Sequence, residues 1–293
     1  MLKYIKNIAV PYHNKNKNQG AFMISAIKLT CSTMRDPSNK NTVLMSEQVN
    51  NYAIFISSLN IPSEIQINYS ITPDRLARKI IKSFTEVVRS HTYINDLNAI
   101  MRTVFESIEM DTDMPILRYP VLSISVLGFE PTKNAYKVFY WNLGSNQLLI
   151  SQEGKTNQLF HNHQMNQYLE LEKELKNKSK NRESYLNNIL LLKKQIKVNN
   201  LPFLYNNYEL IRKAQTGQVN ISEKNFSLLL TNNNTLEQFH CLDLNTYEHL
   251  LTNIRKTATP EKWLQKLYQK VKTDQSLFAY ADFGVVFSSY SIQ

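Results

Sequence analysis

The sequence predicts an α+β fold in which antiparallel sheets pack face to face and helix pairs cover the outside. The main observation is the order of elements along the 293 residues: strands, two helices, strands, helices, a strand, two helices and a last strand. This order lacks the regular alternation of a doubly wound parallel sheet. Hydrophobic residues make up 42% and aromatic residues 11% of the chain, which is typical of a folded core. Neither a repeat nor a linker interrupts the chain, so we expect one domain over residues 1–293.

The first half of the chain begins with strands and continues with two helices. Residues 21–31 and 42–60 are rich in β-branched and aromatic side chains and predict strands. Thr72 and Pro73 then predict a helix start, because threonine is a good N-cap and proline fits the first turn. Apolar residues recur at helical spacing to about residue 91 and again over residues 95–110.

The second half begins with a series of strands, predicted over residues 121–130, 135–142, 147–152 and about 158–160. Residues 164–200 are charged and punctuated by leucines, which predicts a helical hairpin broken near residues 177–182. We expect its charged face to be solvated, the alternative being a coiled coil for a partner. The remaining pattern predicts a strand at 226–231, a turn at 232–234, helices at 243–255 and 259–272, and a strand at 283–290.

Charge and cysteine content limit the classes of function. The net charge is +10, but the basic residues are scattered along the sequence, which argues against a nucleic-acid partner. No apolar run is long enough to span a membrane, and the amino terminus lacks the apolar core of a signal peptide. We therefore expect a cytoplasmic protein, or one exported without a conventional signal peptide. Cys31 and Cys241 are expected to be buried free thiols.

Short motifs offer few sites for catalysis. The chain has only 6 glycines, so it has few places for a phosphate-cradling loop. His161 and His163 could share one face of a strand, but no third metal ligand is evident. Asp111 and Asp113 fit a solvated loop better than a cation site. His240 and Cys241 are sequence neighbours, whose side chains diverge, so they give no evidence for a nucleophile–base pair.

Residues 139–163 form a strand–turn–strand unit with a distinctive spacing. Asn142, Gly144 and Ser145 are followed by an aliphatic strand, then by Gly154, and finally by the pair Asn162-His163. Together with the element order, this hairpin resembles the PPM family, the metal-dependent type-2C serine/threonine phosphatases. The resemblance extends from about residue 21 to residue 290. It implies a four-layer α-β-β-α sandwich of two antiparallel sheets, with residues 164–200 as a charged helical insertion.

The resemblance also implies a site for two Mg²⁺ or Mn²⁺ ions held by aspartates. This chain has no aspartate at most of the matching positions. Hard divalent cations require anionic oxygen ligands. The matching positions, together with Arg35 as the phosphate-contacting arginine, form a predicted vestigial cleft. Its members are Arg35, Asn41, Ser57, Ser58, Asn232, Asn233, Ala281 and Asp282, of which Asp282 alone is acidic. Ser145 likewise stands where the hairpin of the family carries an aspartate.

These substitutions predict a catalytically inactive, PPM-like pseudophosphatase that needs no cofactor and acts by binding a protein. A phosphoprotein is one candidate partner, engaged at the cleft or through residues 164–200. The alternative is an active serine/threonine phosphatase with a rebuilt site, in which Asp282 holds Mg²⁺ or Mn²⁺ with Asn41 and Asn232 as neutral ligands. A weaker alternative is a basic nucleic-acid-binding module.

Overall fold

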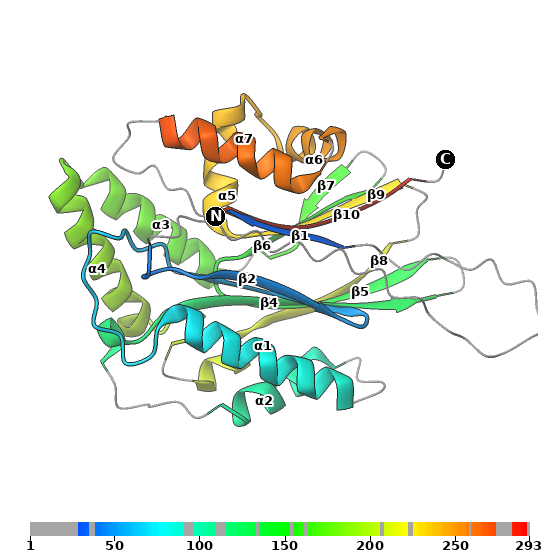
Figure 1. Ribbon diagram of the computed structural model, residues 1–293, viewed down its shortest axis with the longest axis horizontal. Helices are drawn as coiled ribbons and strands as arrows, with labels where there is room; N and C mark the ends of the chain where they lie inside the picture. The colour runs from blue at the N-terminus through cyan, green and yellow to red at the C-terminus, as the bar shows by residue number, and fades with distance from the viewer. Residues whose placement is uncertain are drawn as a thin grey trace, which may run out of the picture.

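The computed structural model describes residues 29–34, 39–90, 96–108, 115–132, 135–152, 155–160, 163–205, 208–221, 225–257, 259–273 and 283–291. In this part of the chain two five-stranded antiparallel sheets lie face to face (Figure 1). Sheet A has the order β1 (Thr30–Met34), β10 (Phe283–Ser291), β9 (Asn225–Thr231), β6 (Gln147–Gln152) and β7 (Lys155–Gln158). Sheet B has the order β2 (Leu44–Val49), β3 (Tyr52–Ser58), β4 (Leu122–Pro131), β5 (Tyr136–Leu143) and β8 (Gln215–Ile221).

Helices cover the outer face of each sheet, which gives the predicted α-β-β-α sandwich (Figure 1). Helices α1 (Pro73–Ser90) and α2 (Leu97–Glu106) pack on sheet B. Helices α5 (Asn233–Gln238), α6 (Tyr247–Lys256) and α7 (Pro260–Thr273) cover sheet A. The hairpin of α3 (His163–Asn177) and α4 (Arg182–Val198) lies beside the sheets, at the end where β2 begins. Short 3-10 helices occur at η1 (Ile116–Arg118), η2 (Tyr208–Lys213) and η3 (Phe239–Leu242).

Three layers of apolar side chains hold these elements together. Alternate residues of each strand point to opposite faces of a sheet, so one set fills the space between the sheets and the other meets the helices. Phe55, Leu127 and Leu228 are fully buried between the sheets. Two tryptophans are also fully buried. Trp141 of β5 points from sheet B toward its helices, and Trp263 of α7 packs on sheet A. The strand ends therefore have fixed positions, and the site is built on them.

Most predicted elements are confirmed, including the helix that begins at Pro73, where the Arg75 backbone N–H donates to Thr72 Oγ1 over 3.3 Å. The hairpin of two helices also breaks where expected, between Asn177 and Arg182. Residues 21–28 lie outside the described residues. None of the helices in the described segments is long and apolar enough to cross a membrane.

Two predictions were wrong, and one strand was missed. Residues 42–60 form two strands, β2 and β3, because the chain turns at Asn50, which adopts a positive φ of 51°. Asparagine tolerates this left-handed conformation better than most residues. Strand β8 was not predicted, since its sequence is polar and carries a glycine. The predicted turn at 232–234 is the start of helix α5.

Candidate functional site

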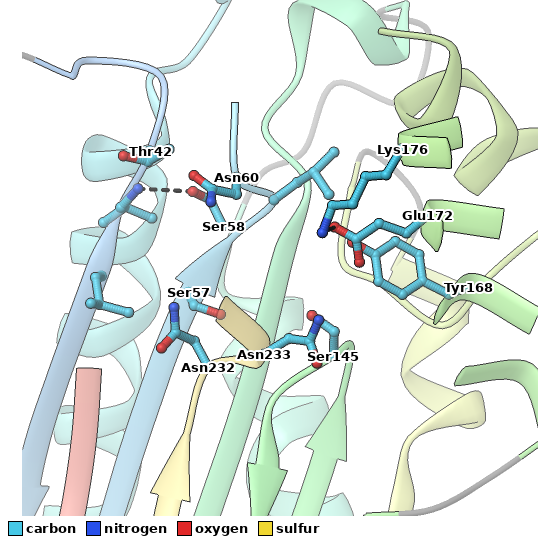
Figure 2. Close-up of a pocket in the computed structure, with 13 residues that line it drawn as sticks. Thr42, Ser57, Ser58, Asn60, Ser145, Tyr168, Glu172, Lys176, Asn232 and Asn233 are labelled. Carbon is cyan, nitrogen blue, oxygen red and sulfur yellow. Dashed lines mark hydrogen bonds and ion pairs between the residues drawn. The ribbon is translucent and has the colours of Figure 1, made fainter. Parts of the chain in front are cut away.

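A small polar cleft lies where the strand ends of the two sheets meet (Figure 2). Its volume is about 40 Å³, room for a few water molecules at about 10–15 Å³ each on this measure. The strand-end residues that line it come from the start of β2, the end of β3, the turn after β5 and the end of β9: Thr42, Val43, Leu44, Ser57, Ser58, Leu59, Asn60, Ser145, Asn232 and Asn233. Sequence-distant residues thus converge, as the predicted cleft requires.

A buried network of uncharged hydrogen bonds supports the cleft from below. The Ser57 hydroxyl donates to Asn146 Oδ1 over 2.6 Å, and the Asn146 amide donates to Ser125 Oγ over 3.0 Å. Ser125 in turn donates to Asn142 Oδ1 over 2.6 Å. The Asn142 amide closes the hairpin by donating to the carbonyls of Gly144 and Asn146. Asn142 is therefore a structural residue of the hairpin, and Ser57 is held by the same network.

Gly144 is required by the tight turn that brings Ser145 to the cleft. Its φ is 112°, a conformation that side chains rarely adopt. A Cβ at this position would also lie 2.6 Å from Ser123 Cα. The Ser145 backbone N–H donates to Ser123 Oγ over 2.9 Å, which fixes the turn against β4.

Asn232 is locked by neighbouring donors at the start of α5. Its Oδ1 accepts from Thr235 Oγ1 over 2.5 Å and from the Gly284 backbone N–H over 3.2 Å. These bonds tie the end of β9 to β10. The Asn232 carboxamide oxygen, which stands at a predicted metal-ligand position, thus already accepts two protein hydrogen bonds.

Asn41 precedes the cleft residue Thr42 and turns its side chain toward the segment after β3. Its amide Nδ2 donates to the carbonyls of Pro62 and Ile65, each over 2.8 Å. Its backbone N–H donates to Asn39 Oδ1 over 3.0 Å. Asn41 therefore shapes one wall of the cleft and is not among the residues that line it.

Helix α3 supplies three further cleft residues that sequence reasoning missed. Tyr168, Glu172 and Lys176 recur at intervals of four and therefore share one face of the helix. Figure 2 shows them reaching toward the strand ends that carry Ser57, Ser145 and Asn232. Glu172 Oε1 and Lys176 Nζ form an ion pair of 3.4 Å, with side chains only 12% and 19% exposed. Their spacing of four residues indicates a shared helix face, but a charged tract of this kind predicts a solvated face and not a cleft wall.

The described residues do not fit the pair of divalent cations that the phosphatase resemblance implies. Asn232 and Ser57 offer neutral oxygens that are already hydrogen-bonded, and the Asn41 amide points elsewhere. Among the described residues that line the cleft, Glu172 is the sole carboxylate, and it is paired with Lys176. No group of three or more His, Cys, Asp or Glu side chains among the described residues could hold a metal ion. Neutral amides and hydroxyls compensate poorly for the dehydration of Mg²⁺ or Mn²⁺.

Asn60 contributes a buried acceptor to the cleft that is available to a ligand. Asn60 Oδ1 is buried and accepts no hydrogen bond from any described residue. A buried acceptor without a donor costs about 1–3 kcal/mol, so an N–H or O–H group entering here would be favoured. The arrangement therefore suits an uncharged hydrogen-bonding group better than a metal ion.

The remaining predicted residues fall into three sets. Ser57, Ser58, Ser145, Asn232 and Asn233 all line the cleft. Those that lie outside the described residues are Arg35, Asp111, Asp113, Gly154, His161, Asn162, Ala281 and Asp282. His163 is the first residue of α3, and its side chain is not described.

The two cysteines are free thiols, as expected, but both are only partly buried. Burial raises the pKa of the Cys31 thiol to about 11, which keeps it protonated at neutral pH. His240 Nδ1 lies 2.8 Å from the Leu244 carbonyl, while Cys241 Sγ contacts Gln238. Neither thiol has the environment of an activated nucleophile.

Comparison with known proteins identifies the fold. No protein-family profile matches the chain, and no curated protein sequence matches it. Among solved structures, the photosystem II phosphatase PBCP superposes with a TM-score of 0.54 at 7% identity. The Mycobacterium tuberculosis serine/threonine phosphatase PstP/Ppp gives 0.53 at 10%, and the S. agalactiae serine/threonine phosphatase gives 0.51 at 11%. Each match covers 91% of this chain and 99% of the other. The chain therefore has the fold of the PPM-type serine/threonine phosphatases.

Proposed function

We propose that this PPM-fold protein is catalytically inactive and acts by binding a protein partner. The observation that carries the proposal is the chemistry of three positions where the phosphatase resemblance requires carboxylates. Asn41, Ser57 and Asn232 occupy them, and each side chain is engaged in hydrogen bonds within the protein. By contrast, the catalytic domain of PstP has been solved in complex with 2 manganese ions.

The architecture of the cleft supports a binding role. Its floor is a hydrogen-bonded network, and its outer wall is the ion-paired face of α3. A rigid polar surface of this kind can fix the orientation of a partner without catalysing a reaction. Lys176, the one cation among the described residues that line the cleft, offers a contact for a phosphoryl group, which keeps a phosphoprotein among the candidate partners.

The α3–α4 hairpin, which we propose is an insertion in a single domain, offers a second contact surface. Among the described residues, the exposed large hydrophobic side chains are Leu191 and Val198, at 45% and 73% exposure. They are seven residues apart on α4 and so share one face. Paired exposed apolar residues on one helix face favour contact with another protein. The free thiols fit a reducing compartment such as the cytoplasm.

Metal titration tests the central claim. Isothermal titration with Mn²⁺ and a p-nitrophenyl phosphate assay should show no tight binding and no metal-dependent turnover, with the PstP catalytic domain as positive control. The double variant Ser57→Asp and Asn232→Asp should bind Mn²⁺ more tightly than the wild type. Asn220→Asp, at an exposed position on β8, is the matched control. Tight two-site binding with turnover in the wild type would contradict the proposal, and loss of that turnover in Asp282→Ala would favour the rebuilt-site alternative.

Peptide binding tests the partner chemistry. A phosphoserine peptide library and its unphosphorylated counterpart should be compared on the wild type, Lys176→Met and Leu191→Ser/Val198→Ser. Loss of phosphopeptide binding in Lys176→Met would assign phosphoprotein recognition to the cleft. Equal binding of both libraries, reduced by the α4 substitutions, would assign recognition to the hairpin. Binding that falls steeply with salt and is reproduced by DNA would instead favour the nucleic-acid alternative.

A further inference from the structure

The most unusual side chain in the described part of the chain is a buried lysine in helix α4. Lys193 is 0% exposed and belongs to the buried face of α4, with Tyr185, Ile189, Leu192 and Ile196. Lysine is almost never fully buried without a charged partner. Its Nζ donates to the Leu117 carbonyl of η1 over 3.1 Å and lies 4.8 Å from the centre of the Tyr69 ring. No carboxylate among the described residues pairs with it.

This buried environment favours the neutral form of the Lys193 amine. Burial lowers the pKa of Lys193 from its ordinary value of 10.5 to about 7. The other charged groups on the neighbouring elements are turned to solvent or to each other. Arg118 of η1 and Lys194 and Lys197 of α4 are exposed, and Glu64 pairs with Arg182 at the surface. The Glu172–Lys176 pair of α3 faces the cleft, and burial raises the pKa of the Tyr69 phenol, which therefore stays neutral.

Two chains of contacts join Lys193 to opposite walls of the cleft. The Tyr69 hydroxyl donates to the Asn41 carbonyl over 3.4 Å, one residue before the cleft residue Thr42. On the other side, α4 holds α3 through Asn188, whose amide donates to the Leu175 carbonyl and to Ser179 Oγ, each over 2.9 Å. Leu175 is adjacent to Lys176, which lines the cleft (Figure 2).

We infer that Lys193 is a proton-sensitive latch, which holds the α3–α4 hairpin over the cleft when its amine is neutral and releases it when the amine is protonated. The direction of the pH dependence follows from the difference between the pKa of Lys193 in the docked and in the released helix. The docked helix binds this proton with a pKa near 7, whereas a released, hydrated lysine binds it with the ordinary value of 10.5. Release therefore takes up a proton between these values, so docking is strongest above about pH 10. It should weaken about tenfold for each pH unit from about 10 to about 7.5 and change little below about pH 6.5.

Hydrogen–deuterium exchange of the full chain tests the latch without any partner or substrate, so its outcome is independent of the proposed function. Exchange is measured at pH 6, 7, 8 and 9 and corrected for intrinsic rates. The opening equilibrium of α3 and α4 should fall about tenfold between pH 8 and 9 and less between pH 6 and 7. Helix α7, which covers the outer face of sheet A, is the internal control and should show no such slope.

Lys193→Met removes the titrating group while keeping most of the side-chain volume, and it should abolish the pH dependence of both helices. Lys194→Met, one residue away and exposed, should leave it intact. A wild-type slope that persists in Lys193→Met would overturn the inference. A pH slope shared by α7 would indicate global unfolding and would also overturn the inference. A slope confined to α4 would show that the latch does not act on the cleft and would overturn it as well. A direct titration of the Lys193 amine by nitrogen NMR provides a second measurement, and a pKa near 10.5 would also overturn it.

Discussion

Two buried polar regions, one beneath the cleft and one around Lys193 of α4, differ in charge. The network below the cleft consists of Ser57, Ser125, Asn142 and Asn146, each at most 4% exposed and each hydrogen-bonded to an uncharged partner. The site behind the cleft holds Lys193, an ionisable group with one carbonyl and one ring face as its contacts. Burying satisfied neutral groups costs little, whereas burying a charge is costly. The first region should therefore define shape at any pH, and the second should respond to pH.

The largest expected effect tests the rigidity of the neutral region. Gly144→Ala forces a side chain into a φ of 112° and against the backbone of Ser123, so we expect a loss of about 4 kcal/mol in unfolding free energy. Gly128→Ala is the matched control, because its Cβ would meet the Tyr52 ring edge at 3.0 Å and the neighbour is a movable side chain. Urea denaturation measures both. Equal losses would show that the turn at Gly144 is not specially constrained.

Removing the centre of the neutral network should have the next largest effect. Asn142→Ala leaves the Ser125 hydroxyl without its acceptor and the Gly144 and Asn146 carbonyls without their donor. We expect a loss of roughly 2–3 kcal/mol, because each unsatisfied buried group costs about 1–3 kcal/mol. The loss should be the same at pH 6 and pH 9, since no member of the network titrates in that range. Gln218→Ala on β8, where the side chain is exposed, is the control and should change stability little.

A substitution in the charged region should raise the unfolding free energy instead of lowering it. Lys193→Met replaces a costly buried amine by an apolar side chain of similar length, so we expect a gain of roughly 1–3 kcal/mol at pH 7. Since the pKa of Lys193 is lowered to about 7 on folding, the wild type regains stability as pH rises from about 7 to 10.5. The advantage of the variant should shrink over the same range. Thermal denaturation at pH 7 and 9.5 measures it, and an advantage that is constant with pH would refute the assignment.

The two regions also differ in how far the sequence predicts them. Strong apolar periodicity and helix-start residues such as Thr72 predicted the layers, and the phosphatase resemblance placed Ser57, Ser145 and Asn232 together. These residues stand at or next to strand ends, where the fold itself brings them close. Strand β8 was missed because an edge strand needs few apolar residues to pair on one side.

The α3–α4 hairpin could be predicted as helices but not as part of the site. A tract rich in glutamate and lysine looks the same in sequence whether its charges face water or a cleft. Glu172 and Lys176 are mostly buried as a pair, whereas Lys178 and Glu174 form a pair that is more than half exposed. Lys193 and Lys194 are adjacent in sequence, yet only the tertiary packing of α4 determines that the first is buried.

The smallest expected effect concerns the surface contact that ties α4 to the segment after β3. Arg182 Nη2 lies 2.6 Å from Glu64 Oε1, with side chains 38% and 49% exposed. Burial raises the pKa of the Glu64 carboxyl, but the hydrogen bond and charge of Arg182 outweigh this and leave that pKa below its ordinary value of 4.5. The contribution is therefore complete above about pH 4.5 and disappears as pH falls below it. Glu64→Gln should cost about 0.5 kcal/mol at pH 7, reduced by 1 M salt, because exposed ion pairs contribute little. Denaturation of the wild type and the variant at two salt concentrations measures it, with Glu86→Gln, whose pair with Lys82 lies within α1, as control. A larger loss, accompanied by faster exchange in α4, would make this ion pair a second fastening of the hairpin beside Lys193.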